Sequence, residues 1–323
     1  MNLLLQYPDL ENDINKIDQI LYGRLSQADE PIRSAAIQLL QAGGKRSRPL
    51  LCLISSSFGE RDRTKAYNMA SAIELIHMSS LIHDDMIDHA QLRRGKKTIH
   101  LQYNTLIATM VGDYLVAEAL EIMALIEDKK AHQLFSSTLK QLAIGELIQY
   151  QNRYQLERSL KTYFKKNRNK TAKFIALSCI LGAIATQADK KLQKHLYLIG
   201  YYLGMSYQIV DDILDFSSNS DEMGKLIGQD LREGYLTLPT LLAMNDDQIY
   251  IKVHNLFKQS NQGNVLDFED LIADIKNSNA ISKAYQYSQW YLEKARLKIN
   301  QLPDQAEKYI FLQLIGYLSK RKY

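Results

Sequence analysis

The chain has 323 residues, of which 46% are apolar and 24% are charged, and its formal net charge is +4. Its 15 glycines and 5 prolines amount to about half of ordinary usage, which argues against sandwiches, barrels and doubly wound sheets because their turns require such residues. The apolar share argues against disorder, and the interleaved charges argue against a nucleic-acid partner. We therefore expect an all-α protein. Because no linker-like tract interrupts residues 1–323, we expect a single domain.

Helical segments follow one another along most of the chain. Pro31 and Pro49 stand where helices are expected to begin, and Gly43-Gly44 stands where one is expected to end. The apolar periodicity predicts helices over 31–41, 49–58, 62–89, 101–127, 131–153, 157–167, 170–187 and 190–216. Residues 217–235 are polar, contain three glycines and predict a long surface loop. The helical pattern resumes from Pro239 and continues to the basic residues 320–322.

Three features bear on the compartment. The longest uncharged stretch, residues 174–188, is 15 residues long, which is short of the ~20 that span a bilayer. The first residues lack the basic start and long apolar run of a signal peptide. Cys52 and Cys179 form no disulfide framework and suggest a reducing compartment. We expect a cytoplasmic chain with no transmembrane segment, and peripheral contact with a membrane stays open.

The motif S-x-x-x-x-D-D-x-x-D occurs twice, in SSLIHDDMID (79–88) and SYQIVDDILD (206–215). Each residue of a helix advances by about 100°, so the three aspartates of each copy share one narrow face. Carboxylates amid apolar neighbours repel one another, and a divalent cation such as Mg²⁺ removes that cost. One such motif alone reads more simply as a solvated acidic helix end. Two copies in matching contexts favour two metal-binding segments.

Several cations lie close to these aspartates in the sequence. The segment Gly43-Gly44-Lys45-Arg46-Ser47-Arg48-Pro49 joins a helix end to a helix start and suits an anion. It can equally be a helix C-cap with a solvated basic loop. Arg93 and Arg94, with Lys96 and Lys97, follow the first aspartates and form either a surface ion-pair patch or a phosphate site. Two metal segments, several cations and an apolar helical interior together suit substrates that carry a diphosphate on a hydrocarbon chain.

The motifs GGKRSRP, HDDMIDHAQLRRG, KTA, QIVDDILD and GKLIGQDLREG stand in the order and spacing of trans-polyprenyl diphosphate synthases, and the chain resembles this family. Within the family it is most similar to the catalytic component (component II) of bacterial heptaprenyl diphosphate synthases. The resemblance implies a bundle of helices around a central cavity, the fold of isoprenoid synthases. It also implies a Mg²⁺-dependent reaction in which isopentenyl diphosphate extends an allylic diphosphate by one trans C5 unit.

The resemblance assigns roles to particular positions. It implies that Mg²⁺ is held by the six aspartates of the two motifs, which are Asp84, Asp85, Asp88, Asp211, Asp212 and Asp215. It implies that isopentenyl diphosphate is bound by Lys45, Arg48, His77 and Arg94. It implies that the allylic diphosphate is bound by Arg93, Lys170, Thr171, Gln208 and Lys225, with Lys170 also catalytic.

Two positions refine the expectation. Ser79, five residues before Asp84, replaces an aromatic residue of many short-chain enzymes and leaves room for a longer product. Tyr235 stands where the family pattern ends in Lys, and this missing cation suggests an obligate second subunit.

We expect heptaprenyl (C35) diphosphate for a menaquinone side chain, made from farnesyl diphosphate with an unlike component I. The alternatives are a non-catalytic prenyl-binding or regulatory subunit and a medium-chain homodimeric synthase.

Overall fold

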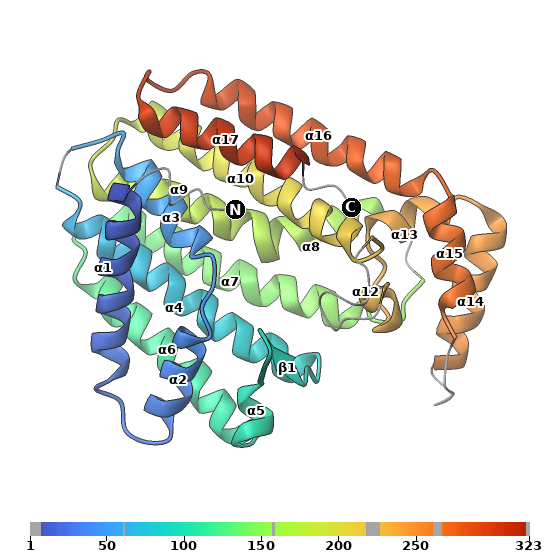
Figure 1. The fold of residues 1–323 in the computed structure, drawn as a ribbon. Helices are drawn as coiled ribbons and strands as arrows, with labels where there is room; N and C mark the ends of the chain where they lie inside the picture. Colours follow the sequence, from blue (N-terminus) through green and yellow to red (C-terminus); the bar gives the residue numbers. More distant parts are fainter. Residues whose placement is uncertain (1–7, 61, 157–158, 218–226, 261–266, 321–323) are drawn as a thin grey trace. The chain divides into compact units, whose positions relative to one another are not determined.

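The computed structural model describes residues 8–60, 62–156, 159–217, 227–260 and 267–320 (Figure 1). Helices make up almost all of its regular structure, which confirms the predicted all-α class. The chain divides into two compact units, Met1–Leu134 with Ser178–Leu196 and Phe135–Leu177 with Tyr197–Tyr323. The expected single domain over 1–323 stays a prediction.

The first unit is built from the N-terminal helices and one small hairpin. Its elements are α1 (Pro8–Leu25), α2 (Ile32–Gln41), α3 (Ser47–Ser56), α4 (Thr64–Ile87), β1 (Leu92–Arg93), β2 (Lys96–Lys97), α5 (Ile99–Gln102) and α6 (Thr105–Ala124). The longest helix that lies wholly in this unit, α4, packs against α1, α3 and α6. The aspartate-bearing end of α4 contacts the hairpin that follows it in the chain, since Arg93 donates to Asp85.

The second unit contains the C-terminal helices. Its elements are α8 (Leu160–Asn167), the π-helix η2 (Arg168–Ala172), α12 (Gln229–Arg232), α13 (Leu238–Ala243), α14 (Asp247–Ser260), α15 (Glu269–Asn277), α16 (Ala280–Ile299) and α17 (Ala306–Lys320). Three further helices have residues in both units, and these are α7 (Lys129–Gln151), α9 (Lys173–Ala185) and α10 (Lys190–Leu214).

Most helix ends lie close to the predicted positions, because local signals set them. Pro31 is the N-cap of α2. The carboxylate of Asp62 accepts a hydrogen bond from the backbone N–H of Thr64, the first residue of α4. Gly43 and Gly44 have φ values of 79° and 153°, a region that favours glycine, so they end the run of α2.

The predicted helices 157–167 and 170–187 left residues 168 and 169 unassigned. Between α8 and α9 the chain forms the π-helix η2, so helical hydrogen bonding continues through residues 168–172. Gly145 of α7 lies against this segment, since a Cβ there would come within 2.9 Å of the backbone nitrogen of Lys170. A π turn inside a helix often marks a functional site.

Two further segments differ from the prediction. Within the expected loop 217–235, residues 229–232 form the short helix α12, and 218–226 lie outside the described residues. Residues 92–97, which were not expected to form strands, pair as an antiparallel hairpin in register Leu92↔Lys97. Arg94 and Gly95 turn this hairpin with φ values of 52° and 77°. The hairpin brings Arg93 back toward the end of α4.

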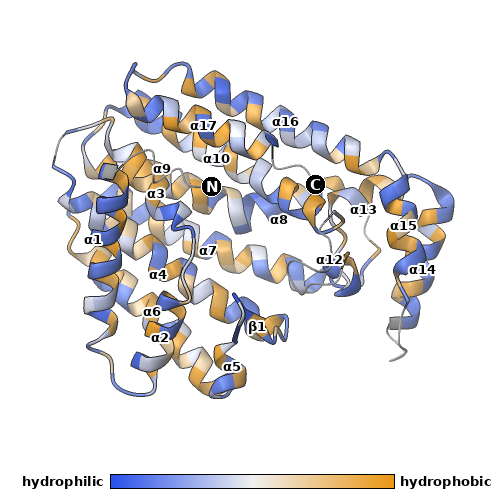
Figure 2. Ribbon diagram, viewed as in Figure 1, coloured by the Kyte–Doolittle hydropathy of each residue, from blue (hydrophilic) through white to orange (hydrophobic). Residues whose placement is uncertain are grey.

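Within the uncharged stretch 174–188, residues 174–186 are buried. Figure 2 shows α9 as a predominantly apolar helix, and its side chains from Phe174 to Ala185 are buried. A Cβ on Gly182 would lie 2.0 Å from the carbonyl oxygen of Cys52, so the backbones of α9 and α3 approach closely. Cys52 and Cys179 are both buried and unpaired with each other. Among the described helices, none combines the length and the apolar character that a bilayer crossing needs.

Candidate active site

The two copies of the aspartate motif occupy equivalent places, at the C-terminal ends of α4 and α10. In both copies the second aspartate is the buried one: Asp85 is 4% exposed and Asp212 is 2% exposed. The leading serines, Ser79 and Ser206, are buried as well. The internal repeat of the sequence is therefore also a repeat of local environment.

In the first copy, Asp85 pairs with Arg93 of the hairpin. The Nε atom of Arg93 donates to both carboxylate oxygens, at 2.9 and 3.2 Å, and its Nη2 atom also donates to Oδ1. This pair joins a predicted metal ligand to a predicted allylic-diphosphate ligand. A cation that binds Asp85, or an anion that binds Arg93, must therefore either break this ion pair or bind alongside it.

A second feature of the first unit gathers three predicted ligands of isopentenyl diphosphate. The guanidinium of Arg94 lies against Gly44, where a Cβ would come within 2.8 Å of Nη1 and Nη2. Burial, together with the positive charges of Arg48 and Arg94, lowers the pKa of His77 well below its usual 6.5. The Nδ1 atom of His77 is buried and has no hydrogen-bond partner among the described residues. A neutral imidazole with an unsatisfied nitrogen beside two guanidinium groups is suited to an anionic ligand.

The neighbouring Arg46 has a structural role that its sequence position did not reveal. It is 7% exposed, and its Nε and Nη1 atoms donate to Asp18 at 2.8 Å and Glu74 at 3.1 Å. Burial raises the pKa of Glu74, an effect that the charges of Arg46 and Arg48 oppose. Within the basic segment 43–49, Arg46 is thus buried and paired with acidic side chains, whereas Lys45 is exposed and Arg48 is half-buried.

The second copy is held in a chain of side-chain hydrogen bonds. Thr171 donates to Gln208 at 2.8 Å, and Gln208 donates to one oxygen of Asp212 at 3.0 Å. The hydroxyl of Tyr163 donates to the other oxygen at 2.5 Å. The structure therefore brings together Thr171, Gln208 and Asp212, which the motifs predicted, and adds Tyr163, which they did not.

Lys170 lies on the π-helix next to Thr171. Its Nζ atom donates to Glu146 at 2.9 Å and approaches the side-chain oxygen of Gln149 at 3.4 Å. The sequence offered one cue to Glu146, because it follows Gly145, whose missing side chain lets η2 approach α7. Nothing in the sequence pointed to Tyr163, because its contact with Asp212 spans 49 residues.

Two of the three carboxylates of the second copy, Asp212 and Asp215, have raised pKa values. Burial raises the pKa of Asp212 to about 7, with Asp230 adding to the shift and Lys166 opposing it. Burial and the charge of Asp230 also raise the pKa of Asp215 to about 7. Asp215 in turn accepts hydrogen bonds from the backbone N–H groups of Gln229 at 3.0 Å and Asp230 at 3.2 Å. A bound cation would favour the ionised form of both groups.

The donor set fits Mg²⁺ in its chemistry. All six predicted ligands are carboxylates, the oxygen ligands that Mg²⁺ prefers. Within the described residues, no group of three or more His, Cys, Asp or Glu side chains is arranged to hold a metal ion. Mg²⁺ usually takes one or two carboxylates, water and substrate phosphates, so a cage of protein ligands is not required. The metal roles of the aspartates stay a prediction.

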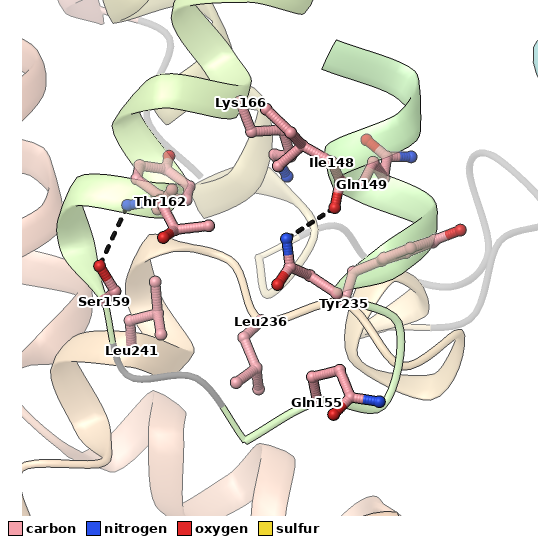
Figure 3. A pocket seen from close by; sticks show the side chains of 11 residues that line it. Ile148, Gln149, Gln155, Ser159, Thr162, Lys166, Tyr235, Leu236 and Leu241 are labelled. Carbon is pink, nitrogen blue, oxygen red and sulfur yellow. Dashed lines mark hydrogen bonds between the residues drawn. The ribbon is translucent and has the colours of Figure 1, made fainter. Parts of the chain in front are cut away.

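A small pocket adjoins the second copy (Figure 3). Its lining includes Tyr163, the partner of Asp212, and Lys166, which lies 5.7 Å from the centre of the Tyr163 ring. Tyr235, which replaces the expected lysine, also lines this pocket and is 7% exposed. Lys225, the remaining predicted ligand, lies outside the described residues.

The chain matches the polyprenyl synthetase family over residues 29–275. It is 42% identical over 324 residues to heptaprenyl diphosphate synthase component 2 of Bacillus subtilis (strain 168), covering 100% of this chain and 92% of that protein. The crystal structure of heptaprenyl diphosphate synthase from Staphylococcus aureus resembles it with a TM-score of 0.91 at 37% identity, covering 97% of this chain and 99% of that one. The polyprenyl synthase of Caulobacter crescentus CB15, complexed with calcium and isoprenyl diphosphate, resembles it with a TM-score of 0.89 at 29% identity, covering 99% of this chain and 97% of that one.

Proposed function

The chain belongs to the polyprenyl synthetase family, and from that premise we propose that it is the catalytic component of a heptaprenyl diphosphate synthase. It would add isopentenyl diphosphate units to an allylic diphosphate such as farnesyl diphosphate until a C35 all-trans chain is formed, for a menaquinone side chain. Support comes from its 42% identity to component 2 of the Bacillus subtilis enzyme and its likeness to the Staphylococcus aureus enzyme.

One observation carries the assignment of the site. The second aspartate of each motif copy is buried and hydrogen-bonded, Asp85 to Arg93 and Asp212 to Tyr163 and Gln208. At a helix end with no ligand, such carboxylates would stay in water and would pay no desolvation free energy. Burial of one carboxylate at the same position of each repeat supports a charged ligand at each of them.

We assign the two substrates to the two groups of side chains. Isopentenyl diphosphate would be bound by Arg48, His77 and Arg94, together with Lys45, which is exposed in the same basic segment as Arg48. Because the pKa of His77 is lowered, its imidazole is neutral at pH 7 and can donate one hydrogen bond without repelling the arginines.

The allylic diphosphate would be bound by the five side chains Arg93, Lys170, Thr171, Gln208 and Lys225. The complex of the Caulobacter crescentus enzyme with calcium and isoprenyl diphosphate supports the pairing of a divalent cation with a diphosphate in this fold.

The chemistry follows from this arrangement. Mg²⁺ bound by the six aspartates would neutralise the diphosphate charge and stabilise it as a leaving group. Arg93 and Lys170 would hold the departing diphosphate by charge-assisted hydrogen bonds. The oxygens of Thr171 and Gln208, linked at 2.8 Å, would present fixed dipoles to the positive charge that develops on the allylic carbon. A carbon–oxygen bond breaks, a carbon–carbon bond forms, and the released diphosphate takes the proton that isopentenyl loses.

A second, unlike subunit is part of the proposal. The Bacillus subtilis relative is designated component 2, which implies a component 1 for that enzyme. In this chain α6 exposes several large apolar side chains along its length, Leu106, Met110 and Leu120, which are 63%, 46% and 49% exposed. Such a face is suited to a protein partner. We also propose that the enzyme works in the cytoplasm.

The test is synthesis by the purified chain with and without its partner protein. Farnesyl diphosphate, labelled isopentenyl diphosphate and Mg²⁺ are supplied, and the dephosphorylated products are separated by chain length. We expect C35 product only when both proteins are present. Robust C35 synthesis by the chain alone would refute the two-component proposal, and no prenyl transfer under any condition would refute the enzymatic one.

A further inference from the structure

Residues 228–235 form a short connected segment that depends on its surroundings for its conformation. The segment contains α12, which has only four residues, and such a helix is not stable by itself. It begins and ends in the left-handed region, since Gly228 has φ 69° and Gly234 has φ 89°. Its fixed position must therefore come from contacts with the rest of the second unit.

One end of this segment is bonded to Asp215. The backbone N–H of Gly228 donates to the carbonyl oxygen of Asp215 at 2.8 Å. The N–H groups of Gln229 and Asp230 donate to the two carboxylate oxygens of Asp215, at 3.0 and 3.2 Å. The orientation of the Asp215 carboxylate is thus set by the position of the first residues of α12.

The other end is bonded to the turn that follows α7. The N–H of Tyr154 donates to the carbonyl of Gly234 at 2.8 Å, and its hydroxyl donates to the carbonyl of Arg232 at 3.0 Å. The Nε atom of Arg153 donates to the carbonyl of Glu233 at 2.8 Å. Three consecutive carbonyls of the segment are therefore held by two consecutive residues.

Aromatic packing reinforces these bonds. The guanidinium of Arg153 lies 5.5 Å from the ring centre of Tyr154 and 5.9 Å from that of Tyr235. The ring of Tyr154 packs on Gly234 so closely that a Cβ there would lie 2.7 Å from three ring carbons. Tyr235, which replaces the expected lysine, is thus one of the groups around Arg153.

We propose that Arg153 and Tyr154 are positioning residues for Asp215, and this inference rests on the proposed function of that carboxylate as a Mg²⁺ ligand. They hold the C-terminal end of α12 and the residues that follow it, up to residue 235. The first residues of α12 in turn orient the carboxylate of Asp215. Neither residue touches the carboxylate. Loosening them should weaken Mg²⁺ binding while leaving the fold and the reaction at saturating Mg²⁺ in place.

The test compares Arg153→Met and Tyr154→Phe with matched controls. Tyr154→Phe removes only the hydroxyl that donates to Arg232 and keeps the ring against Gly234, so it is the variant least able to disturb folding. The controls are Arg296→Met and Tyr309→Phe. These exposed residues of α16 and α17 contact the surface carboxylates of Glu293 and Asp304.

Two readouts are needed. The first is the Mg²⁺ concentration that gives half-maximal turnover with the partner protein present. The second needs no turnover: it is the Mg²⁺ concentration that gives half of the rise in melting temperature in a fixed amount of inorganic diphosphate. We expect both concentrations to rise about three- to tenfold in Arg153→Met and less in Tyr154→Phe, since residues that orient ligands typically affect metal affinity by about ten- to a hundredfold when they contact the ligand directly.

The outcomes separate this inference from the proposed function. Unchanged Mg²⁺ dependence in both variants would overturn the positioning role, even if their melting temperatures fall. If Arg153→Met does not fold, the Mg²⁺ dependence of Tyr154→Phe alone tests the positioning role. If the wild-type chain transfers no prenyl group with its partner, the proposed function fails, whereas the melting readout still reports whether the two residues support Mg²⁺ binding.

Discussion

Asp212→Asn should stabilise the metal-free protein at pH 8 while abolishing turnover. Burial raises the pKa of Asp212 from 3.8 to about 7, so the folded chain holds a proton there that the unfolded chain releases. The stabilisation from that proton is fully present below the unfolded pKa and is lost as the pH rises through the folded pKa. Above pH 7 the ionised, buried carboxylate makes the folded state less stable by about 4 kcal/mol than it would be with a neutral group of the same shape.

The hydrogen bonds reduce this figure only in part. Asparagine still offers an oxygen to Gln208, but the bond from Tyr163 must reverse its direction, at a cost of about 1 kcal/mol. The net gain at pH 8 should be about 3 kcal/mol. Because the wild-type protein loses about 2.5 kcal/mol between pH 5 and pH 8 through this one group, the advantage of Asp212→Asn should shrink by that amount at pH 5.

The assay is urea unfolding of both proteins in EDTA at pH 5 and pH 8. The control is Asp270→Asn, at an exposed position of α15, which should change stability by less than about 0.5 kcal/mol at either pH. An equal effect of Asp212→Asn at the two pH values, or a destabilisation at pH 8, would refute the prediction that the ionised Asp212 carboxylate lowers the stability of the folded state.

Three further predictions concern turnover with the partner present. Asp84→Ala and Asp211→Ala should each lower kcat by a factor that corresponds to at least ~3 kcal/mol, and near wild-type rates or full activity in EDTA would contradict Mg²⁺ binding by both motif copies. Arg94→Lys should raise the KM for isopentenyl diphosphate because the guanidinium fork against Gly44 is lost; steady-state kinetics with each substrate varied in turn measures this, and unchanged constants would count against the assignment. Ser79→Tyr should shorten the products, since a ring at this buried position would fill the space that the growing prenyl chain needs. Chromatography that shows the same chain length would place that wall elsewhere.

The sequence by itself determined the class of fold and the equivalent positions of the two aspartate motifs at helix ends. Low glycine and proline content, apolar periodicity and local caps such as Asp62 are properties of short segments, so they predicted helix ends to within a few residues. The repeat S-x-x-x-x-D-D-x-x-D predicted that both copies occupy the ends of helices, and α4 and α10 end there. Among the predicted ligands of the two diphosphates, the structure places Arg48, His77 and Arg94 near one another, and it joins Thr171, the neighbour of Lys170, to Gln208.

Tertiary structure decided which of these residues are buried and what they touch. A helical wheel treats the aspartates of a motif as one face, but only packing makes Asp85 and Asp212 buried and leaves Asp211 exposed. Residues 168 and 169, which the predicted helices left unassigned, lie in a π-helix, because hydrogen bonds with a longer spacing let the chain continue. The contacts of Tyr163 with Asp212 and of Arg153 with Glu233 join residues 49 and 80 positions apart. Such contacts depend on how helices pack, and periodicity within one segment carries no information about its distant partners.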